Sequence, residues 1–264
     1  MSYSLIFPGQ GSQEVGMGRD IRDAFKSAAE VFQRADDALS FSLSKIIFDG
    51  PEEELRRTAY TQPAILVASI AAISVLEELV GKHLQPASLA GHSLGEYTAL
   101  VAARTLSLED GVRLVHLRGR LMQEAVPEGK GAMAAILGLD AQAVSDICQE
   151  VAPLHECQPA NFNSPGQIVI SGETEFVEKA MLLAKEKGAK KTVLLNVSAP
   201  FHSRLMRPVA DQLLTAFKQC AWGNPSAPIV SNVRALPVAN IQDIQDALFH
   251  QTYRSEERRV GKEC

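Results

Sequence analysis

The sequence predicts an α/β fold in which a large domain with a parallel sheet carries a smaller inserted domain. In the first hundred residues an apolar strand pattern alternates twice with a helical pattern, and this order is typical of parallel sheets. From Gly131 the order becomes strand, helix, strand, strand, helix, strand, which is the ferredoxin-like arrangement. We therefore expect the large domain over 1–127 and 198–253 and the small domain over 128–197.

The elements of the large domain follow from the spacing of its apolar residues. The run YSLIF is short and is ended by the turn residues of PGQGSQ, and the segment after Gln62 is so apolar that its helix should be buried. In chain order we expect a strand at 3–7, helices over 21–39 and 62–79, a strand at 87–93, a helix over 94–104, a loop entering a helix over 198–214, and a strand at 228–233.

The small domain is predicted from four apolar strand patterns and two amphipathic helices. Its expected elements are a strand at 131–139, a helix over 141–151, strands at 158–163 and 167–172 across an SPG turn, a helix over 175–187, and a strand at 190–197. A sheet covered by two helices on one face can bury a core of its own.

Composition and charge exclude several classes of function. The net charge of -5 provides no general attraction to nucleic acid or to an anionic membrane. The four cysteines contain no CxxC pair, so neither a zinc site nor a disulfide framework is predicted. The start lacks a basic signal-peptide region, and the apolar run 64–76 stops at Glu77, too early to span a bilayer. We expect a cytoplasmic protein.

The stretch GHSLG, residues 91–95, is the clearest candidate for a catalytic site. Gly-x-Ser-x-Gly between a strand and a helix is the nucleophile-elbow pattern of α/β-hydrolase-like folds, with Ser93 as nucleophile. The first N–H groups of the following helix can stabilise an oxyanion, and Leu94 is the natural donor. His92 and Ser93 are neighbours on a tight turn and point apart, so His202 is the better candidate base. A polar cluster at 198–203 that caps a helix remains an alternative for His202.

Five motifs make the chain resemble the malonyl-CoA:acyl carrier protein transacylases, the stand-alone acyltransferases of fatty acid synthesis. They are FPGQGSQ at 7–13, GHSLGEY at 91–97, LRGRLMQ at 117–123, NFNSPGQ at 161–167 and FHSRLM at 201–206. The resemblance extends from the N-terminus to about Tyr253. It implies a monomer that transfers malonyl from malonyl-CoA to an acyl carrier protein, without a metal or another cofactor and without a nucleic acid or membrane partner.

The resemblance also implies roles for single residues. Ser93 would be the nucleophile and His202 the base, and the backbone N–H groups of Gln10 and Leu94 would form the oxyanion hole. The backbone carbonyl of Gln251 would orient the histidine, which explains why no acidic third member stands out.

Four further residues would contact the substrate. Arg118 would pair with the malonyl carboxylate, since the planar guanidinium can donate two parallel hydrogen bonds to a carboxylate. Without the family resemblance, an arginine in a helix would be interpreted as a surface charge. Asn161 and Asn163 would line the thioester channel, although a structural turn explains them equally well. Phe201, just before the base, resembles the residue that the family associates with malonyl rather than with the bulkier methylmalonyl unit. Alternatively, it is an aromatic side chain that only packs in the fold.

Alternative functions and an unusual end of the chain remain open at this stage. A trans-acting acyltransferase of a polyketide synthase shares every motif, whereas a serine esterase would place an acidic residue between serine and histidine. A chain that keeps the motifs but fails to fold is a further alternative. The resemblance implies a chain truncated at the C-terminus, because the family continues after Tyr253 with a helix, another strand and a final helix. The segment RSEERRVGKEC, 254–264, instead has seven charged residues in eleven, so we expect a foreign tail outside the fold. Without the family's last strand and helix we expect a less stable protein.

Overall fold

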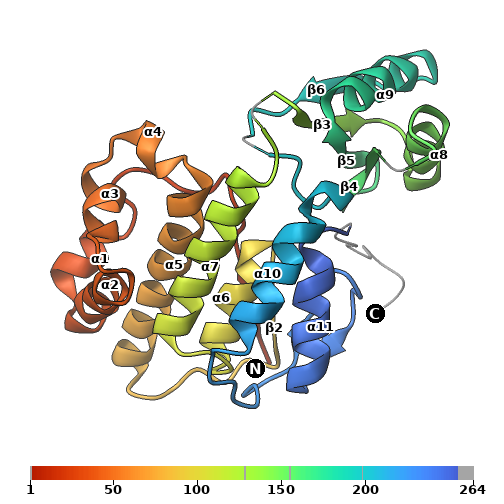
Figure 1. Ribbon diagram of the computed structural model, residues 1–264. Coiled ribbons are helices and arrows are strands. Elements are labelled where there is room, and N and C mark those ends of the chain that lie inside the picture. Colours follow the sequence, from red (N-terminus) through yellow and green to blue (C-terminus); the bar gives the residue numbers. More distant parts are fainter. Residues whose placement is uncertain (1, 128, 155, 198, 255–264) are drawn as a thin grey trace. The chain divides into compact units, whose positions relative to one another are not determined.

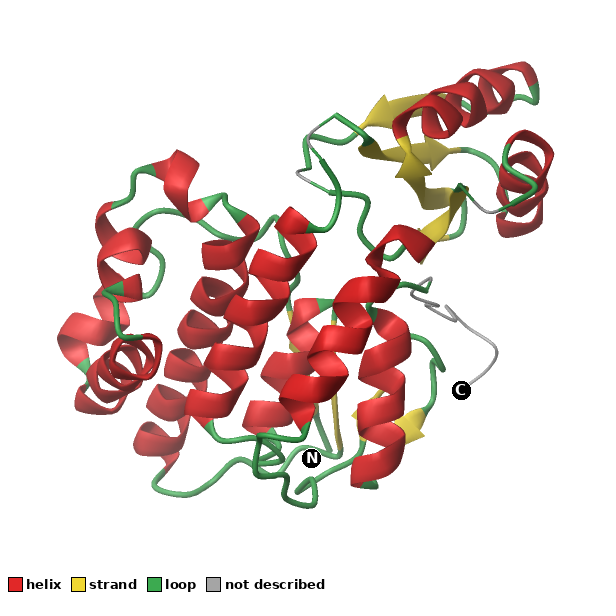
Figure 2. Cartoon of the chain, in the orientation of Figure 1, coloured by secondary structure: helices red, strands yellow, loops and turns green. Residues whose placement is uncertain are grey.

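A computed structural model describes residues 2–127, 129–154, 156–197 and 199–254. Figures 1 and 2 show their helices and strands. By their internal contacts they form two compact units, the first of 2–120, 213–231 and 236–245 and the second of 121–212, 232–235 and 246–254. The domain bounds expected from the sequence stay a prediction, and the expected tail lies outside the described residues from 255 onward.

The first unit is built on a four-stranded sheet of order β1-β2-β7-β8. The strands are β1 Ser4–Phe7, β2 Ser88–Gly91, β7 Ile229–Val230 and β8 Pro237–Val238. The first three run parallel, with Ser4 opposite Ser88 and Leu89 opposite Ile229, whereas β8 is antiparallel to β7. The predicted parallel sheet is therefore confirmed. Strand β8 was not predicted, because two residues are too few for an alternating pattern to show.

The helices that begin in the first unit differ in part from the prediction. They are α1 Arg19–Ala24, α2 Lys26–Leu39, α3 Leu43–Asp49, α4 Glu52–Leu55, α5 Thr58–Val80, α6 Leu94–Ala102, α7 Leu108–Glu124 and α11 Ile241–Gln251. The single helix expected over 21–39 is wrong, since Phe25 is extended, with φ -129° and ψ 128°, and separates α1 from α2. Helix α6 packs on β1 and β2, and α5 packs on α6 and α2.

Helix α5 is the apolar centre of the first unit. By length and composition it is the one described helix that could cross a membrane, with a mean hydropathy of 1.9 over a window that is 44% buried. Its contacts with α2 and α6 and the complete burial of Leu66 are those of a core helix. Pro63 lies inside α5 and cannot donate to the carbonyl of Ala59. The Nδ1 atom of His116 on α7 lies 2.8 Å from that oxygen and donates to it instead.

The second unit has the ferredoxin-like order that the sequence predicts. Its elements are β3 Gly131–Leu137, α8 Ala141–Val151, β4 Cys157–Ser164, β5 Gln167–Glu173, α9 Thr174–Glu186 and β6 Lys191–Leu194, followed by the short 3-10 helix Arg204–Met206 and by α10 Arg207–Phe217, which continues into the first unit. The sheet is antiparallel with the order β4-β5-β3-β6.

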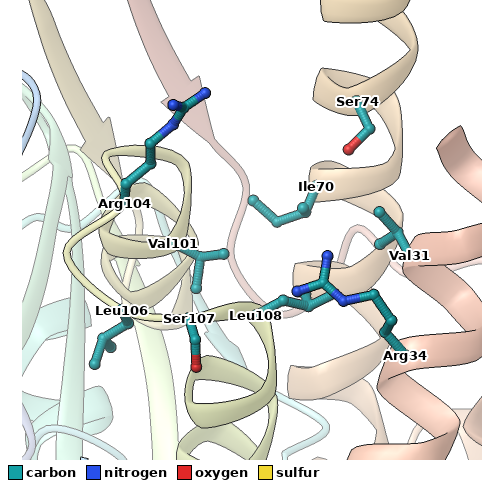
Figure 3. Close-up of a pocket in the computed structure, with 9 residues that line it drawn as sticks. All are labelled: Val31, Arg34, Ile70, Ser74, Val101, Arg104, Leu106, Ser107 and Leu108. Atoms are coloured by element: carbon teal, nitrogen blue, oxygen red, sulfur yellow. The ribbon is translucent and has the colours of Figure 1, made fainter. Parts of the chain in front are cut away.

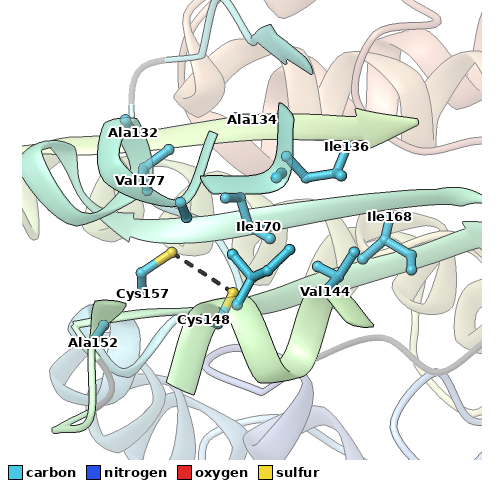
Figure 4. Close-up of a cluster of buried hydrophobic side chains, with 13 residues drawn as sticks. Ala132, Ala134, Ile136, Val144, Cys148, Ala152, Cys157, Ile168, Ile170 and Val177 are labelled. Atoms are coloured by element: carbon cyan, nitrogen blue, oxygen red, sulfur yellow. Dashed lines mark hydrogen bonds between the residues drawn. The ribbon is translucent and has the colours of Figure 1, made fainter. Parts of the chain in front are cut away.

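A separate apolar core holds this second unit together (Figure 4). Ala134 and Ile136 of β3 project on the same face, as alternate strand residues do, and belong to one buried cluster with Ile170 of β5, Val144 of α8 and Val177 of α9. In the same cluster the sulfur atoms of Cys148 and Cys157 lie 4.0 Å apart. The hydrogen bond with Cys148 and burial raise the pKa of Cys157 far above its ordinary value, so the Cys157 thiol stays protonated.

Candidate active site

Ser93 lies at the sharp turn between β2 and α6. As the N-cap of α6 it has φ 52° and ψ -106°, a conformation that is strained for a residue with a side chain. A Cβ atom on Gly91 would lie 2.0 Å from the carbonyl carbon of Gly95, and one on Gly95 would lie 2.6 Å from the oxygen of Phe7. Both distances are far below any real contact. The two glycines are therefore required so that the turn can bring Ser93 to the end of the strand.

The N-terminus of α6 supplies donors beside this serine. Leu94 is the first helical residue, so α6 contains no carbonyl four residues earlier for its N–H. The next two N–H groups donate within the turn, Gly95 to His92 and Glu96 to Ser93. The turn thus presents the positive end of a helix dipole, which suits a developing oxyanion.

Gln10 belongs to the loop that follows β1, and this loop packs against the same turn. A Cβ atom on Gly9 would lie 2.3 Å from the imidazole of His92, so backbone and ring are in close contact there. The side chain of Gln10 donates from Nε2 to the hydroxyl of Thr58 across 3.3 Å. Thr58 is fully buried, and the bond therefore fixes the Gln10 loop to the start of α5.

Arg118 on α7 is buried and contacts Ser93. Only 1% of the residue is exposed, which rules out the surface charge that its sequence context alone suggested. Its Nη1 donates to Oε1 of Gln62 across 2.8 Å, and its Nη2 donates to Oγ of Ser93 across 3.0 Å. The guanidinium carbon also lies 5.5 Å from the ring centroid of Tyr97. One arm of the guanidinium fork is thus held by an amide while the other points at the candidate nucleophile.

The ring of Tyr97 packs against the guanidinium of Arg118. The side chain is fully buried, and burial raises its pKa to about 12, although the positive charge of Arg118 acts in the opposite direction. The phenol therefore stays neutral across the physiological pH range. Neither Tyr97 nor Gln62 was predicted as a site residue. The only available signal was that Tyr97 lies within the GHSLGEY motif.

His202 lies in the second unit, in a buried loop that precedes α10. It is 3% exposed and has φ 56°, again in the left-handed region. Its Nδ1 lies 2.7 Å from the backbone oxygen of Gln251. Because a carbonyl oxygen only accepts, Nδ1 carries the proton, and in the neutral ring Nε2 keeps its lone pair. The ring is thus in the tautomer that a general base at Nε2 needs.

The residues around His202 explain how this loop is held. The hydroxyl of Ser203 donates to the oxygen of Pro200 across 2.7 Å and makes no bond that caps the 3-10 helix after it. The side-chain amide of Gln251, which is fully buried, donates to Oδ1 of Asn232 across 3.3 Å. Asn232 was not predicted as a site residue, since its partner lies at the far end of α11.

Three other predicted residues also lie in the second unit. Phe201 is 9% exposed and directly precedes His202. Asn161 is buried in β4, and Asn163 lies in the same strand near a register irregularity. A role for these residues in substrate binding stays a prediction. Among the described residues no group of three or more His, Cys, Asp or Glu could hold a metal ion.

A pocket of about 440 Å³ in the first unit lies at the other end of α6 (Figure 3). Its apolar wall includes Val101 and Leu108, and two arginines stand beside it. Both arginines have acidic partners: Arg34 contacts Glu109 at 2.8 Å, and Arg104 contacts Glu77 at 3.6 Å. The neighbouring charges are therefore balanced, and the pocket has no excess charge to select an anion.

Comparison with known proteins places this arrangement among enzymes. The family model described as an acyl transferase domain matches residues 4–256. The malonyl CoA-acyl carrier protein transacylase of Escherichia coli K12 is 47% identical over 251 residues, which are 95% of this chain and 81% of the relative. The protein of the same name from Bacillus subtilis is also 47% identical, and 78% of its length is covered.

Solved structures agree with these relatives. The malonyl CoA-acyl carrier protein transacylase of Coxiella burnetii is 41% identical, with a TM-score of 0.92 over 97% of this chain and 80% of that one. A malonyl-transacylase in complex with its type II PKS acyl-carrier protein is 45% identical, with a TM-score of 0.92 over 97% and 82%. The match of nearly the whole described chain, in sequence and in fold, shows that this chain belongs to the acyl transferase domain family and, within it, to the malonyl CoA-acyl carrier protein transacylases.

Proposed function

We propose that Ser93 carries a malonyl group from malonyl-CoA to the phosphopantetheine thiol of an acyl carrier protein, with His202 as the general base. The chain is an acyltransferase whose donor is malonyl-CoA and whose acceptor is an acyl carrier protein. The observation that supports Ser93 most directly is its hydroxyl at a strained helix N-terminus, 3.0 Å from a buried guanidinium nitrogen.

The first half-reaction forms an ester on Ser93. Nε2 of His202 takes the hydroxyl proton while Oγ attacks the thioester carbonyl of malonyl-CoA. The N–H groups of Leu94 and Gln10 stabilise the resulting oxyanion. The carbon–sulfur bond then breaks, and the imidazolium returns its proton to the sulfur, so free coenzyme A leaves.

The second half-reaction uses the same groups in reverse. Nε2 of His202 takes the proton of the phosphopantetheine thiol, and the sulfur attacks the ester carbonyl. When the carbon–oxygen bond breaks, Oγ of Ser93 regains the proton and malonyl-acyl carrier protein is released. Because one imidazole serves both halves, its loss should slow both.

Arg118 provides selectivity for malonyl in this proposal. A guanidinium can bind a carboxylate through two parallel hydrogen bonds, and burial strengthens such a contact. The arm that contacts Ser93 would turn to the malonyl carboxylate. An acetyl group offers no carboxylate, so it would gain nothing from Arg118. Asn161, Asn163 and Phe201 are proposed to line the path of the thioester.

A second candidate differs only in the acceptor. One of the similar solved structures is a malonyl-transacylase bound to the acyl-carrier protein of a type II PKS, and this favours polyketide loading as the alternative to fatty acid synthesis. Transfer rates to carrier proteins of both kinds, measured at equal concentration, would decide between them.

Incubation with malonyl-CoA followed by intact-mass measurement tests the central proposal. The wild-type protein should gain one malonyl group and lose it when a carrier protein is added. Ser93→Ala should gain none, whereas Ser12→Ala, in the neighbouring loop after β1, should label like the wild type. A malonyl adduct on the Ser93→Ala protein would refute the assignment.

The proposed reaction needs no cofactor. The steps above use only side chains and backbone groups of this chain, so we propose a reaction without a cofactor, and activity should survive dialysis against a metal chelator. A cytoplasmic location and a monomeric state stay predictions.

A further inference from the structure

Gln158, the second residue of β4, makes three hydrogen bonds to the segments that hold His202. Its Nε2 donates to the backbone oxygen of His202 across 3.1 Å and to the backbone oxygen of Tyr253 across 3.4 Å. Its Oε1 accepts from the backbone N–H of Arg204 across 3.3 Å. A single half-buried side chain therefore joins a strand of the sheet, the loop that contains His202 and the segment that follows α11.

The orientation of this amide follows from its partners. Both neighbours of the nitrogen are carbonyl oxygens, which only accept, and the neighbour of the oxygen is an N–H group, which only donates. The opposite orientation would set an oxygen against two oxygens and an NH₂ group against an N–H. All three contacts thus require a glutamine amide with its nitrogen toward His202 and Tyr253.

These contacts brace both ends of the bond that fixes the imidazole. The donor of that bond is Nδ1 of His202, and the acceptor is the oxygen of Gln251, two residues before Tyr253. Gln158 is hydrogen-bonded to the backbone of both His202 and Tyr253. It therefore limits the movement of the His202 loop relative to the segment that contains Gln251 and Tyr253. The left-handed backbone of His202 is strained and needs such support from its surroundings.

Tyr253, one of the three partners of Gln158, is itself held in place by Arg207. The residue is 8% exposed, and its hydroxyl accepts from Nη1 of Arg207 across 3.1 Å. The guanidinium of Arg207 also lies over the rings of Tyr253 and Phe249, 4.9 and 4.8 Å from their centroids. The carbonyl that Gln158 holds therefore belongs to a residue that is fixed on its other side as well.

We propose that Gln158 is a positioning residue for the histidine: its amide bridge keeps the imidazole of His202 aligned with the carbonyl of Gln251. The inference rests on the proposed role of His202 as the general base. Gln158 lies outside the five motifs that carry the family resemblance.

Two substitutions separate the parts of the bridge. Gln158→Met keeps the length of the side chain and removes all three bonds, whereas Gln158→Glu keeps an acceptor for Arg204 but sets an oxygen against two carbonyls. In both variants the kcat of malonyl transfer should fall by about tenfold or more, since small misplacements of a catalytic group cost that much. The KM for malonyl-CoA should stay within about twofold, because Gln158 does not touch the substrate in this proposal.

Gln142→Met serves as the matched control. Gln142 is exposed on α8 of the same unit and bonds only to Asp146 among its described partners, so the substitution should leave kcat unchanged. Rates are compared at a temperature at which circular dichroism shows every variant to be folded. If the methionine variant melts too early for that, the glutamate variant decides.

The NMR resonance of the His202 ring N–H proton tests the positioning role directly. It should change when the imidazole is misaligned, but not when a substitution only lowers the stability of the fold. In the wild type this proton resonance should be visible and slow to exchange, and it is assigned by its loss in His202→Ala. In Gln158→Met it should broaden or exchange faster while the backbone spectrum of the sheet is preserved. An unchanged resonance together with wild-type kcat would overturn the proposal.

The failure of this inference can be told from a failure of the proposed function. If His202→Ala transfers malonyl at the wild-type rate, then His202 is not the base and the proposed function fails. If His202→Ala is inactive while both Gln158 variants match the wild type, only the positioning role is refuted.

Discussion

The guanidinium of Arg118 donates from Nη2 to the hydroxyl oxygen of Ser93 across 3.0 Å. The two residues are 25 positions apart, Ser93 at the turn before α6 and Arg118 on α7, and their contact is partly buried. A cation fixed beside the nucleophile favours negative charge on the oxygen. In the proposed function the same cation would bind the carboxylate of the acyl group and so select the substrate.

Replacement of Arg118 by alanine should lower malonyl transfer more than acetyl transfer. A charge-assisted hydrogen bond contributes about 1.5 to 3 kcal/mol, which corresponds to roughly ten- to hundredfold in the ratio of kcat/KM values. Steady-state rates with both acyl-CoA substrates measure the ratio. Arg113→Ala, an exposed arginine on the same helix, is the control. Equal losses for the two substrates would show that Arg118 only supports the fold.

Replacement of His202 by alanine should slow the formation of the Ser93 ester and its transfer to the thiol. Loss of a general base typically costs about 10² to 10⁴ in rate. Rapid-quench measurements with malonyl-CoA, and separately with pre-formed ester and carrier protein, report the two halves. His92→Ala is the comparison, because this neighbour packs against Gly9. A larger loss in His92→Ala would mean that the base is His92.

Tyr97 should make the protein less stable at high pH. Its pKa is 10.0 in the unfolded chain and about 12 in the fold, so between these values the unfolded state loses a proton that the native state keeps. The contribution is therefore fully present below pH 10 and is lost as the pH rises toward 12. Urea melts from pH 8 to pH 11 measure it, and Tyr97→Phe should remove that part of the pH dependence. The wild-type spectrum minus the Tyr97→Phe spectrum should show phenolate only near pH 12.

Gly95→Ala should destabilise the first unit strongly. The added Cβ would lie 2.6 Å from the oxygen of Phe7 and 2.8 Å from that of Pro8, and backbone atoms cannot move aside as a flexible side chain can. We expect a loss of about 2 to 4 kcal/mol, in the range of severe packing defects. Gly81→Ala, at the end of α5 in the same unit, is the control, since the space there is open and only its φ of 64° carries a cost, about 1 to 2 kcal/mol. Similar melting points for the two variants would contradict the steric argument.

The features that the sequence predicted well depend on neighbouring residues. Helix α8 has the predicted bounds because Asp140 accepts a hydrogen bond from the N–H of Ala143 and marks its start. The turn at Ser93 was predicted because Gly91 and Gly95 leave space for the neighbouring backbone, and this requirement is visible in the local sequence. The break at Phe25 was missed, since α1 and α2 share one apolar period across it.

The features that the sequence did not reveal depend on residues far apart in the chain. Gln62 and Arg118 are 56 positions apart, and Gln158 and Tyr253 are 95 apart. No periodicity or spacing connects such pairs, because only the tertiary fold brings them into contact. The catalytic candidates could therefore be predicted from motifs, whereas the side chains that hold them could not.

The acceptor for the His202 ring is a backbone oxygen, and this has a consequence for mutational surveys. Every amino acid brings the same carbonyl to position 251, so no substitution of a side chain removes the group that accepts from the histidine ring. Substitutions at Gln158, Asn232 or Gln251 can shift this carbonyl but not remove it. An ester in place of the peptide bond between Gln251 and Thr252 would instead weaken it as an acceptor. If Ser93 and His202 act as proposed, a survey of side chains would report these two residues and miss the backbone oxygen that holds the histidine ring.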